Sequence, residues 1–547
     1  MEKQPKLPSK SSEDSSSHDN NGDRPARGVK RQGQEPPPNP SKVARRSPAT
    51  PGLGQQPRPP ALAMTYPNGG LRITRTPGRR NAKNCVSLGD LIDKDHLVSA
   101  CIFAFYIADE ELFPHLPNST GDKDAVPIYI GRDANNDPLL QAAARRARLP
   151  LAEGKLTKKT LDVLRPHIEA LHQAAHPERR DLRPFYAWAP GSAHSKLLLL
   201  VYPTFLRVVI TSCNLMDIDT VLGDNHWYIH DVPRRSGLAT RPPAGFEGTL
   251  LAHLEALGTP AAFLDSVRGR YDYGTLKVYL VTSHPGTFVG PGKAEQHGLL
   301  RLRKVVKHLG LGLGEGEKSE HDKDNDEVRL DICPASVGNL SARWLTAFHQ
   351  CALGQQEIEL TPGDEEENDD DALFEKMRLF YPSVDDVRND PADSKDAASN
   401  IGCHLRPWEK APQAVQRLFH NYRSRDAGRL FHQKLVMAYD PREPEDTPHY
   451  VYIGSANLSQ SAWGALAEDK RKGGNAATCD TKLTGVTNFE CGVVIPGRVI
   501  GGLLEPGTGS WQEGVVPFDR AAAGYDLKRD RPWNDPRWVK GYRDDYD

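Results

Sequence analysis

Apolar positions along this chain form two kinds of segment, which alternate from about residue 80 onward. Short, almost continuous apolar runs have the length of strands, and they lie at 97–107, 126–131, 276–283 and 377–384. Longer segments repeat their apolar positions every three or four residues, as amphipathic helices do. These segments lie at 161–176, 297–309 and 340–353. Strands that alternate with helices predict an α/β fold.

One combination of polar residues and strands occurs twice. Each copy has an imidazole, an ammonium group, a strand, a turn, a second strand and an amide, in that order. The two sets are His194, Lys196 and Asn214, and His432, Lys434 and Asn457. Their separation is close to the size of a domain. The repeat therefore predicts two similar domains related by a pseudo-twofold axis, with one active site at their interface.

The segments between these copies suggest where the domains begin and end. Residues 1–80 read as a basic tail, because they contain too few apolar and aromatic residues to form a core. A Gly/Pro-rich stretch at 284–293 separates a first domain, 81–290, from a second, 291–547. Two strongly acidic runs, near 312–328 and 362–372, are expected to be insertions in the second domain.

The duplicated residues suit chemistry on a phosphodiester. In a strand, residues two apart project from the same face, so each histidine points with its lysine. One neutral imidazole can attack phosphorus, and the other can donate a proton to the leaving oxygen and then activate water. Lysine and asparagine side chains can stabilise the charge on the non-bridging oxygens. This chemistry requires neither a cofactor nor a metal.

Other features limit the alternatives. The formal net charge is -2, so composition does not by itself indicate a nucleic-acid binder. The eight cysteines contain no C-x-x-C pair, and reduced thiols are expected. No apolar run approaches the length of a membrane span, which predicts a soluble protein. Two further histidine motifs, 172–176 and 321–323, lack the residues or strands that would make them zinc or catalytic sites.

The tail contains two short basic clusters, Lys30-Arg31 and a second one formed by Lys42, Arg45 and Arg46. Their spacing resembles a bipartite nuclear import signal, which predicts a nuclear protein. The alternative is a basic tail that makes only non-specific contacts with anions.

The paired H-x-K motifs resemble the phospholipase D superfamily. The aspartate expected five residues after each lysine is absent, because Val201 and Tyr439 occupy those positions. Loss of both aspartates, with an asparagine downstream, resembles the tyrosyl-DNA phosphodiesterase branch, in a fungal-like form. Further stretches agree with this resemblance from about residue 80 to the end: YLVTSHPGTFVG (279–290), GSANLSQSAWGAL (454–466) and FECGVV (489–494).

This resemblance implies two phospholipase D-like α-β-α sandwich domains in a protein expected to be a monomer. The implied reaction is hydrolysis of the bond between a DNA 3′-phosphate and the tyrosine of a trapped topoisomerase I, and of other blocked 3′ ends on single- or double-stranded DNA. His194 would be the nucleophile that forms a phosphohistidine, and His432 the general acid and base. The two lysines and two asparagines would bind phosphate, and Glu490 would orient the second histidine.

The chain also departs from the family pattern. Asn225 stands where a glutamine commonly orients the first histidine, and its shorter amide would reach that ring through water or not at all. Pro190 replaces an aromatic residue that stacks on DNA. Ser383 and Ser459 match positions that contact DNA phosphates, although serines in turns also cap backbone groups.

Two other functions stay open from the sequence. One is a phospholipase D-type lipid hydrolase or transphosphatidylase, against which the missing aspartates and basic tail count. The other is a catalytically inactive module that binds DNA ends, against which the completeness of both half-sites counts.

Overall fold

The computed structural model describes residues 62–79, 82–118, 125–149, 156–310, 328–355, 358, 375–389, 397–426, 429–442, 447–468 and 481–535. The predicted import signal and nearly all of both predicted acidic insertions lie outside these ranges. Across the described part of the chain, no helix is both long and apolar enough to span a bilayer.

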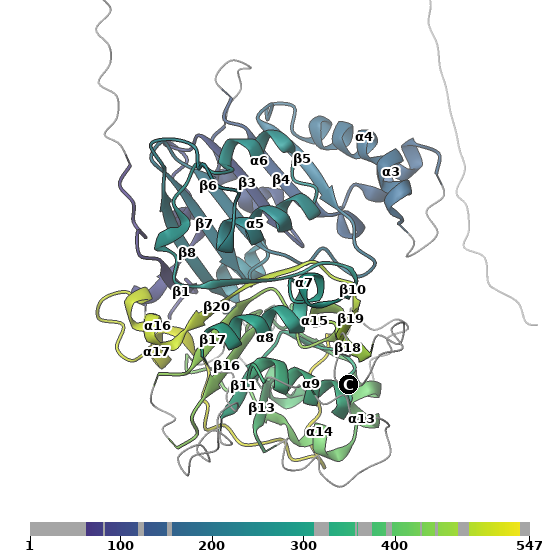
Figure 1. The fold of residues 1–547 in the computed structure, drawn as a ribbon. Coiled ribbons are helices and arrows are strands. Elements are labelled where there is room, and N and C mark those ends of the chain that lie inside the picture. Colours follow the sequence, from purple (N-terminus) through teal and green to yellow (C-terminus); the bar gives the residue numbers. More distant parts are fainter. Residues whose placement is uncertain are drawn as a thin grey trace, which may run out of the picture. The chain divides into compact units, whose positions relative to one another are not determined.

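The first large sheet has eight strands in the order β2-β1-β8-β7-β6-β3-β4-β5 (Figure 1). Their bounds are β1 Gly70–Thr74, β2 Cys85–Val86, β3 Ser99–Ala104, β4 Ile128–Asp133, β5 Leu182–Ala187, β6 Leu197–Val201, β7 Phe205–Thr211 and β8 His226–Pro233. Residues 70–275, which contain this sheet, are called the first half below.

The second large sheet has seven strands in the order β15-β13-β11-β16-β17-β20-β9. Their bounds are β9 Tyr279–Ser283, β11 Arg329–Cys333, β13 Met377–Tyr381, β15 Phe419–Asn421, β16 Leu435–Tyr439, β17 Tyr450–Gly454 and β20 Glu490–Pro496. Smaller sheets contain β10 Gly286–Val289, β12 Ser336–Val337, β14 Gly402–Cys403, β18 Ala465–Glu468 and β19 Thr481–Val486. Residues 279–535 are called the second half.

The two large sheets have the same topology. In both, three neighbouring strands pair in parallel, β3-β4-β5 in one and β11-β13-β15 in the other. The next four pairings are antiparallel in each sheet and end at β1 and at β9. The pattern confirms two similar α/β domains.

This correspondence moves both predicted domain boundaries. The first half begins with β1, so residues 70–79 do not belong to the predicted tail. The second half begins with β9, which pairs with β20 and lies before the predicted boundary at 290. Both errors have the same cause: the first strand of each half is short and is followed by a Pro/Gly-containing turn, which resembles a linker in sequence.

Helices cover the sheets. Their bounds are α1 Leu88–Leu91, α2 Asp109–Leu112, α3 Leu140–Arg146, α4 Lys158–Ala175, α5 Gly245–Ala256, α6 Ala261–Val267, α7 Pro291–Ala294, α8 Gly298–His308, α9 Ala342–Ala352, α11 Val384–Arg388, α13 Leu405–Lys410, α14 Gln413–Arg417, α15 Gln460–Trp463, α16 Gly497–Leu503 and α17 Trp511–Val515. Figure 1 shows α5 and α6 on one face of the first sheet, and α8 and α9 on one face of the second. The helices predicted at 161–176, 297–309 and 340–353 are α4, α8 and α9.

The central strands of the first sheet are buried on both faces. Alternate residues of β6 belong to different apolar clusters: Leu197 and Leu199 to one, Leu198 and Leu200 to the other. This explains why the segment reads as a continuous apolar run rather than as an alternating one. A strand with both faces packed can hold the residues at its ends rigidly.

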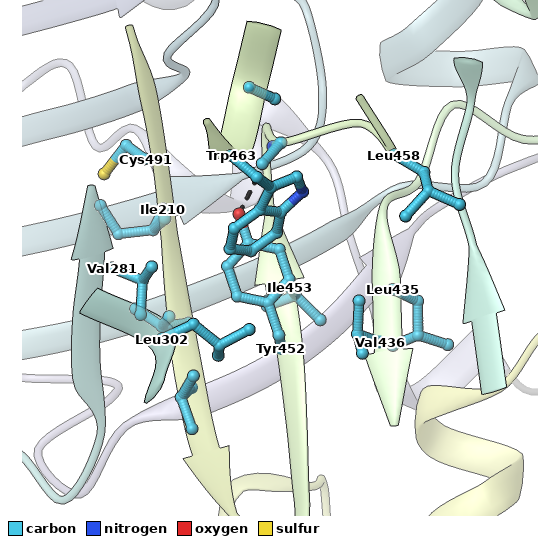
Figure 2. Packing of buried hydrophobic residues seen from close by; sticks show 14 of the residues in the cluster. Ile210, Val281, Leu302, Leu435, Val436, Tyr452, Ile453, Leu458, Trp463 and Cys491 are labelled. Atoms are coloured by element: carbon cyan, nitrogen blue, oxygen red, sulfur yellow. Dashed lines mark hydrogen bonds between the residues drawn. The ribbon is translucent and has the colours of Figure 1, made fainter. Parts of the chain in front are cut away.

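One apolar cluster continues from the first half into the second. Figure 2 shows Ile210, from β7 of the first half, beside Val281 and Cys491 of the second half. Tyr452 and Trp463 pack in the same cluster, with their ring centroids 5.0 Å apart. The two halves therefore share a core, which fixes the strand ends of one half against those of the other.

Gly454 and Gly492 lie opposite each other on β17 and β20. A Cβ at Gly454 would lie 2.3 Å from Cα of Gly492 and 2.7 Å from the carbonyl oxygen of Cys491. Backbone atoms cannot move aside as a flexible side chain can. These glycines therefore allow β17 and β20 to pack closely next to Ser455 and Glu490.

We expect Gly454→Ala to lower the free energy of unfolding by about 1–3 kcal/mol, because the new methyl group overpacks the paired strands. Urea denaturation followed by circular dichroism measures this. Gly501→Ala is the control, since a Cβ there meets nothing within 4 Å on helix α16, and it should stabilise the protein by about 0.5–1 kcal/mol. Equal midpoints for Gly454→Ala and the parent protein would contradict the close-packing argument.

Candidate active site

The duplicated polar residues lie at corresponding strand ends. His194 and Lys196 come directly before β6, and Asn214 follows β7. In the second half, His432 and Lys434 come before β16, and Asn457 follows β17. Because β6 pairs with β7 and β16 with β17, each histidine, lysine and asparagine set lies at one end of its sheet.

The backbone of each histidine is held by the other half. The amide of His194 donates to the carbonyl of Phe489, with N and O 2.9 Å apart. The amide of His432 donates to the carbonyl of Asp224, also at 2.9 Å. Short bridges, Ala193 with Phe489 and Asp224 with Phe431, accompany these bonds. The structure therefore brings the two half-sites together, as the repeat predicted.

Glu490 contacts the first histidine. Its Oε2 lies 3.0 Å from Nδ1 of His194, and both side chains are almost fully buried. The prediction that Glu490 orients the second histidine is therefore wrong. The reason lies in the cross-half bridge: Phe489 pairs with Ala193, so the next residue of β20 faces the ring of His194 rather than the histidine of its own half.

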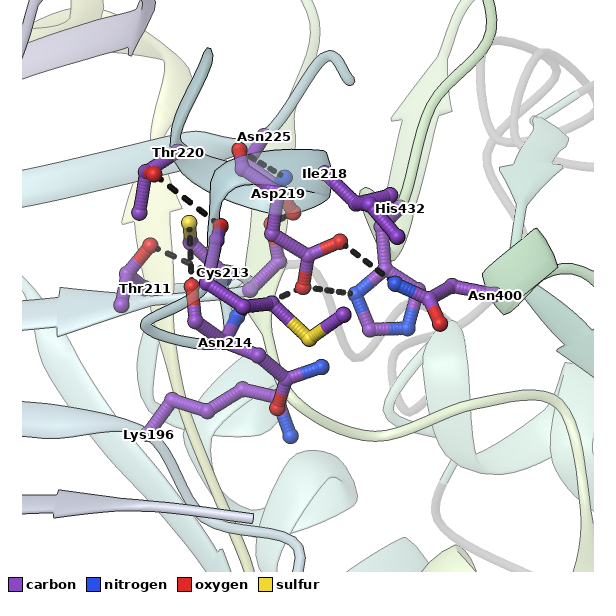
Figure 3. Close-up of polar contacts among 12 residues, drawn as sticks. Lys196, Thr211, Cys213, Asn214, Ile218, Asp219, Thr220, Asn225, Asn400 and His432 are labelled. Carbon is purple, nitrogen blue, oxygen red and sulfur yellow. Dashed lines mark hydrogen bonds and ion pairs between the residues drawn. The ribbon is translucent and has the colours of Figure 1, made fainter. Parts of the chain in front are cut away.

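Asp219 contacts the second histidine. Its Oδ2 lies 2.8 Å from Nδ1 of His432 (Figure 3). The same carboxylate accepts hydrogen bonds from the backbone amide of Asn214 at 2.7 Å and from Nδ2 of Asn400 at 2.9 Å. Comparison of the two sequence copies did not identify Asp219. It follows Asn214 by five residues, and the residue at the same distance after Asn457 is Ala462, which is not acidic. The available signal was an acidic residue in the short helical turn (η4, Ile218–Leu222) that follows Asn214.

Asn225 is the counterpart of Glu490 in the first half. Ser212 donates to its Oδ1 at 2.7 Å, as Ser455 donates to Glu490 at 2.5 Å. Its Nδ2, however, donates to the backbone carbonyl of Asp219 at 3.0 Å. Asn225 therefore makes no direct contact with the first histidine, which is one of the two possibilities that the sequence left open. Its short side chain supports the turn that carries the carboxylate facing His432.

The two lysines are completely enclosed. Nζ of Lys196 donates to the carbonyl of His194 at 2.7 Å, and Nζ of Lys434 donates to the carbonyl of His432 at 2.5 Å. Burial lowers the pKa of Lys196 to about 8 and that of Lys434 well below its ordinary value. Two poorly solvated cations of this kind form a strong site for an anion.

Both imidazoles are neutral near pH 7 in the free protein. Burial lowers the pKa of His194, Lys196 lowers it further, and Glu490 opposes the shift. Burial also lowers the pKa of His432, to about 3, against the opposing effect of Asp219. Lys434 acts on His194, and Lys196 acts on His432. The pKa of each ring is therefore shifted by charges from both halves, as expected if the two rings share one site.

The remaining site residues lie around these pairs. Figure 3 shows the amide of Asn214 beside the end of the Lys196 side chain, and Oδ1 of Asn457 accepts from the amide of Ser336 at 2.9 Å. Phe105, which sequence reasoning missed, packs edge-on against His194 with centroids 5.1 Å apart, and its ring lies 5.3 Å from Nζ of Lys196. This aromatic contact helps to fix the orientation of the His194 ring.

Comparison with known proteins identifies the family. A model of the tyrosyl-DNA phosphodiesterase family matches residues 71–533, which is most of the chain. This chain belongs to the tyrosyl-DNA phosphodiesterase family. The resemblance inferred from the motifs is thereby confirmed.

Individual relatives of this tyrosyl-DNA phosphodiesterase family member are distant. The chain is 24% identical over 411 residues to tyrosyl-DNA phosphodiesterase 1 of Arabidopsis thaliana, which covers 71% of this chain and 56% of the relative. It therefore spans about half the length of that curated relative. The solved yeast tyrosyl-DNA phosphodiesterase has a TM-score of 0.56 at 14% identity, over 85% of this chain and 100% of the yeast chain. A mutant of the yeast enzyme gives 0.57 at 16% identity, over 85% and 100%. These structures confirm the fold.

Two serines predicted to contact DNA are helix caps in this family member. The side chain of Ser383 accepts from the amide of Asp386 at the start of α11, and that of Ser459 accepts from the amide of Ala462 at the start of α15. The capping alternative therefore accounts for both hydroxyls. A contact with DNA phosphate stays a prediction. Pro190 is exposed, so its surface is accessible to a ligand, but it offers no aromatic face.

Among the described residues, no group of three or more acidic, histidine or cysteine side chains is arranged to hold a metal. Nε2 of His172 lies 3.0 Å from Asp137, and Nε2 of His176 lies 3.2 Å from Asp109. The two histidines, at the end of α4, thus pair with two different aspartates outside that helix. The other histidine motif, 321–323, lies outside the described ranges.

We expect Glu490→Gln to lower the pKa of His194 further, because the carboxylate favours the protonated ring and the amide does not. Titration of the histidine ring signals by NMR measures this. Glu110→Gln, on the exposed surface of α2, is the control and should leave the His194 titration unchanged. An unchanged His194 pKa in Glu490→Gln would show that the observed contact does not stabilise the imidazolium.

Proposed function

We propose that this protein hydrolyses phosphodiester bonds at DNA 3′ ends, including the bond to a tyrosine, through a phosphohistidine formed on His194. The observation that supports this most strongly is the crossed anchoring of the two rings. Glu490 and Asp219 each engage Nδ1 of a histidine, at 3.0 and 2.8 Å. Each ring therefore has Nε2 available for chemistry, next to two buried cations. Membership of the family supplies the substrate class.

In the first step, Nε2 of His194 attacks phosphorus. Its lowered pKa keeps the ring neutral, so the lone pair is present near pH 7. Glu490 accepts a hydrogen bond from Nδ1–H of His194. Its carboxylate thereby stabilises the positive charge that develops on the ring as the N–P bond forms. The P–O bond to tyrosine breaks, and the phenol oxygen receives a proton from His432.

His432 must be protonated when it acts as the acid. In the free protein its pKa is lowered, but a bound phosphodiester adds a negative charge beside the ring, which raises the pKa. Asp219, which stays ionised, favours the same change. Substrate binding and protonation of His432 are therefore coupled. His432 would therefore become protonated only when a phosphodiester is bound in the site.

In the second step, His432 has lost its proton and becomes the base. It takes a proton from a water molecule as that water attacks phosphorus on the side opposite His194. The N–P bond breaks, and His194 returns to its neutral form. Lys196, Lys434, Asn214 and Asn457 neutralise or hydrogen-bond the non-bridging oxygens in both steps, which is the main task of the protein in phosphoryl transfer.

The natural substrate proposed is a DNA 3′ end blocked by the tyrosine of topoisomerase I or by a peptide derived from it, in the nucleus. The protein would act as a monomer without a cofactor. Because Pro190 cannot stack on a base, binding at that position would depend on contacts with the DNA backbone.

We expect His194→Ala to abolish cleavage of an oligonucleotide that carries a 3′-phosphotyrosine. His432→Ala should slow turnover by about 10²–10⁴-fold, which is the usual contribution of general acid–base catalysis, and should accumulate a protein–DNA adduct. A gel assay with excess EDTA measures turnover, and intact-protein mass spectrometry detects the adduct.

His176→Ala is the matched control for these variants, since this histidine, just after α4, pairs with Asp109 of α2 and takes no part in the site. Near-normal rates for His194→Ala would rule out the proposed nucleophile. Hydrolysis of phosphatidylcholine without turnover of the oligonucleotide would replace the proposal with a lipid hydrolase, and DNA binding without turnover would replace it with an end-binding module.

A further inference from the structure

A short segment after β1 reaches the loop that carries the second histidine. Arg79 forms an ion pair with Asp224 and lies 3.3 Å from Oδ2 of Asp426. The side chains of Arg79 and Asp224 are 6% and 0% exposed, so this pair is removed from water. Asp426 belongs to the loop that leads to His432, whereas Arg79 and Asp224 belong to the first half.

The backbone of the same segment is attached to the same loop. The guanidinium of Arg429 donates to the carbonyl of Pro77. Gly78 makes the turn between these residues with a φ of +71°, and a Cβ there would lie 3.2 Å from Nη2 of Arg429. The segment 77–79 therefore contacts, at both ends of its turn, the described residues 424–426 and 429–431, which together are called the loop 424–431.

Asp224 transmits this attachment to His432. Its amide donates to the carbonyl of Leu430 at 3.0 Å, and its carbonyl accepts from the amide of His432 at 2.9 Å. The next residue, Asn225, holds the backbone of Asp219, whose carboxylate faces Nδ1 of His432. Asp224 thus lies between Arg79 and both groups that fix the position of His432.

The chemistry of the pair suits positioning better than stability. A buried ion pair adds little net stability over an apolar pair of the same size, because desolvation offsets the attraction. Removal of one partner, however, leaves the other charge buried and uncompensated. A buried arginine fork has a fixed geometry, and here it would hold Asp224 at a defined place.

We propose that Arg79 is a positioning residue for His432, which acts through Asp224 and the loop 424–431. This inference rests on the proposed function, because it assigns to His432 the role of general acid and base. Without the ion pair, Asp224 shifts, and His432 loses its alignment with the leaving oxygen and with the attacking water. The nucleophile His194, which is anchored by Phe489 and Glu490, keeps its alignment.

The leaving group separates this role from a purely structural one. Tyrosine is a basic leaving group that needs a proton, whereas 4-nitrophenolate leaves without one. We expect Arg79→Gln to slow single-turnover release of tyrosine roughly tenfold or more, as part of the 10²–10⁴-fold that acid–base catalysis contributes. Release of 4-nitrophenolate from the matching 3′ ester should change less than threefold, and hydrolysis of the adduct should slow together with tyrosine release.

Three further variants are measured on the same full-length chain. Arg79→Lys keeps the charge but loses the fork, so it should show a weaker form of the same leaving-group effect. The double variant Arg79→Gln with Asp224→Asn removes both charges of the fully buried pair. Its thermal midpoint should lie nearer that of the parent protein than the midpoint of Arg79→Gln does, while tyrosine release stays slow. Arg75→Gln is the matched control, because Arg75 pairs with Asp90 at the exposed surface and should change neither rate.

The outcomes distinguish the two proposals. If the parent protein releases neither leaving group, the proposed function fails. If the parent is active and Arg79→Gln, Arg79→Lys and the double variant lose tyrosine and 4-nitrophenolate release equally, Arg79 supports the fold only and the positioning role is wrong. If Arg79→Gln does not fold, the same comparison for Arg79→Lys and the double variant decides.

Discussion

The structure depends on one constraint: the carboxylate that contacts each of the two paired histidines comes from the other half. The backbone amide of His194 donates to the carbonyl of Phe489, and its ring contacts the carboxylate of Glu490, both from the second half. The backbone amide of His432 donates to the carbonyl of Asp224, and its ring contacts the carboxylate of Asp219, both from the first half. This exchange requires the two sheets to meet at their strand ends. The shared apolar core, with Ile210 among residues of the second half, keeps them there.

Burial determines the pKa values of the titratable groups in the site. Lys196 and Lys434 are both buried away from solvent. Their lowered pKa values show that burial makes the charged ammonium forms less favourable. A phosphodiester offsets this cost, because its charge compensates both ammonium groups. In the proposed reaction, the same negative charge raises the pKa of His432 and so favours its acid form. The proposal thereby links the binding of substrate to the protonation state that the reaction needs.

Much of this architecture could be read from the sequence, because apolar runs with both faces buried are conspicuous and because the polar half-site is repeated. The residues that contact the two histidine rings could not be predicted from the sequence. Glu490 was assigned to the wrong ring, since strand order within one half does not reveal which residue faces the other half. Asp219 has no counterpart in the second copy, so comparison of the repeats hid it. Strand β1 was missed, and β9, although predicted as a strand, was placed in the wrong half, because each is short and precedes a Pro/Gly turn.

The unequal surroundings of the two rings follow from Glu490 and Asn225, which occupy equivalent places and carry different side chains. Two identical subunits related by true symmetry would place the same residue beside both rings, and the rings would then have equal proton affinity. Joining the halves in one polypeptide removes that restriction, because each position can mutate alone. The proposed division of labour between nucleophile and proton donor therefore depends on two halves that are fused and have diverged in sequence.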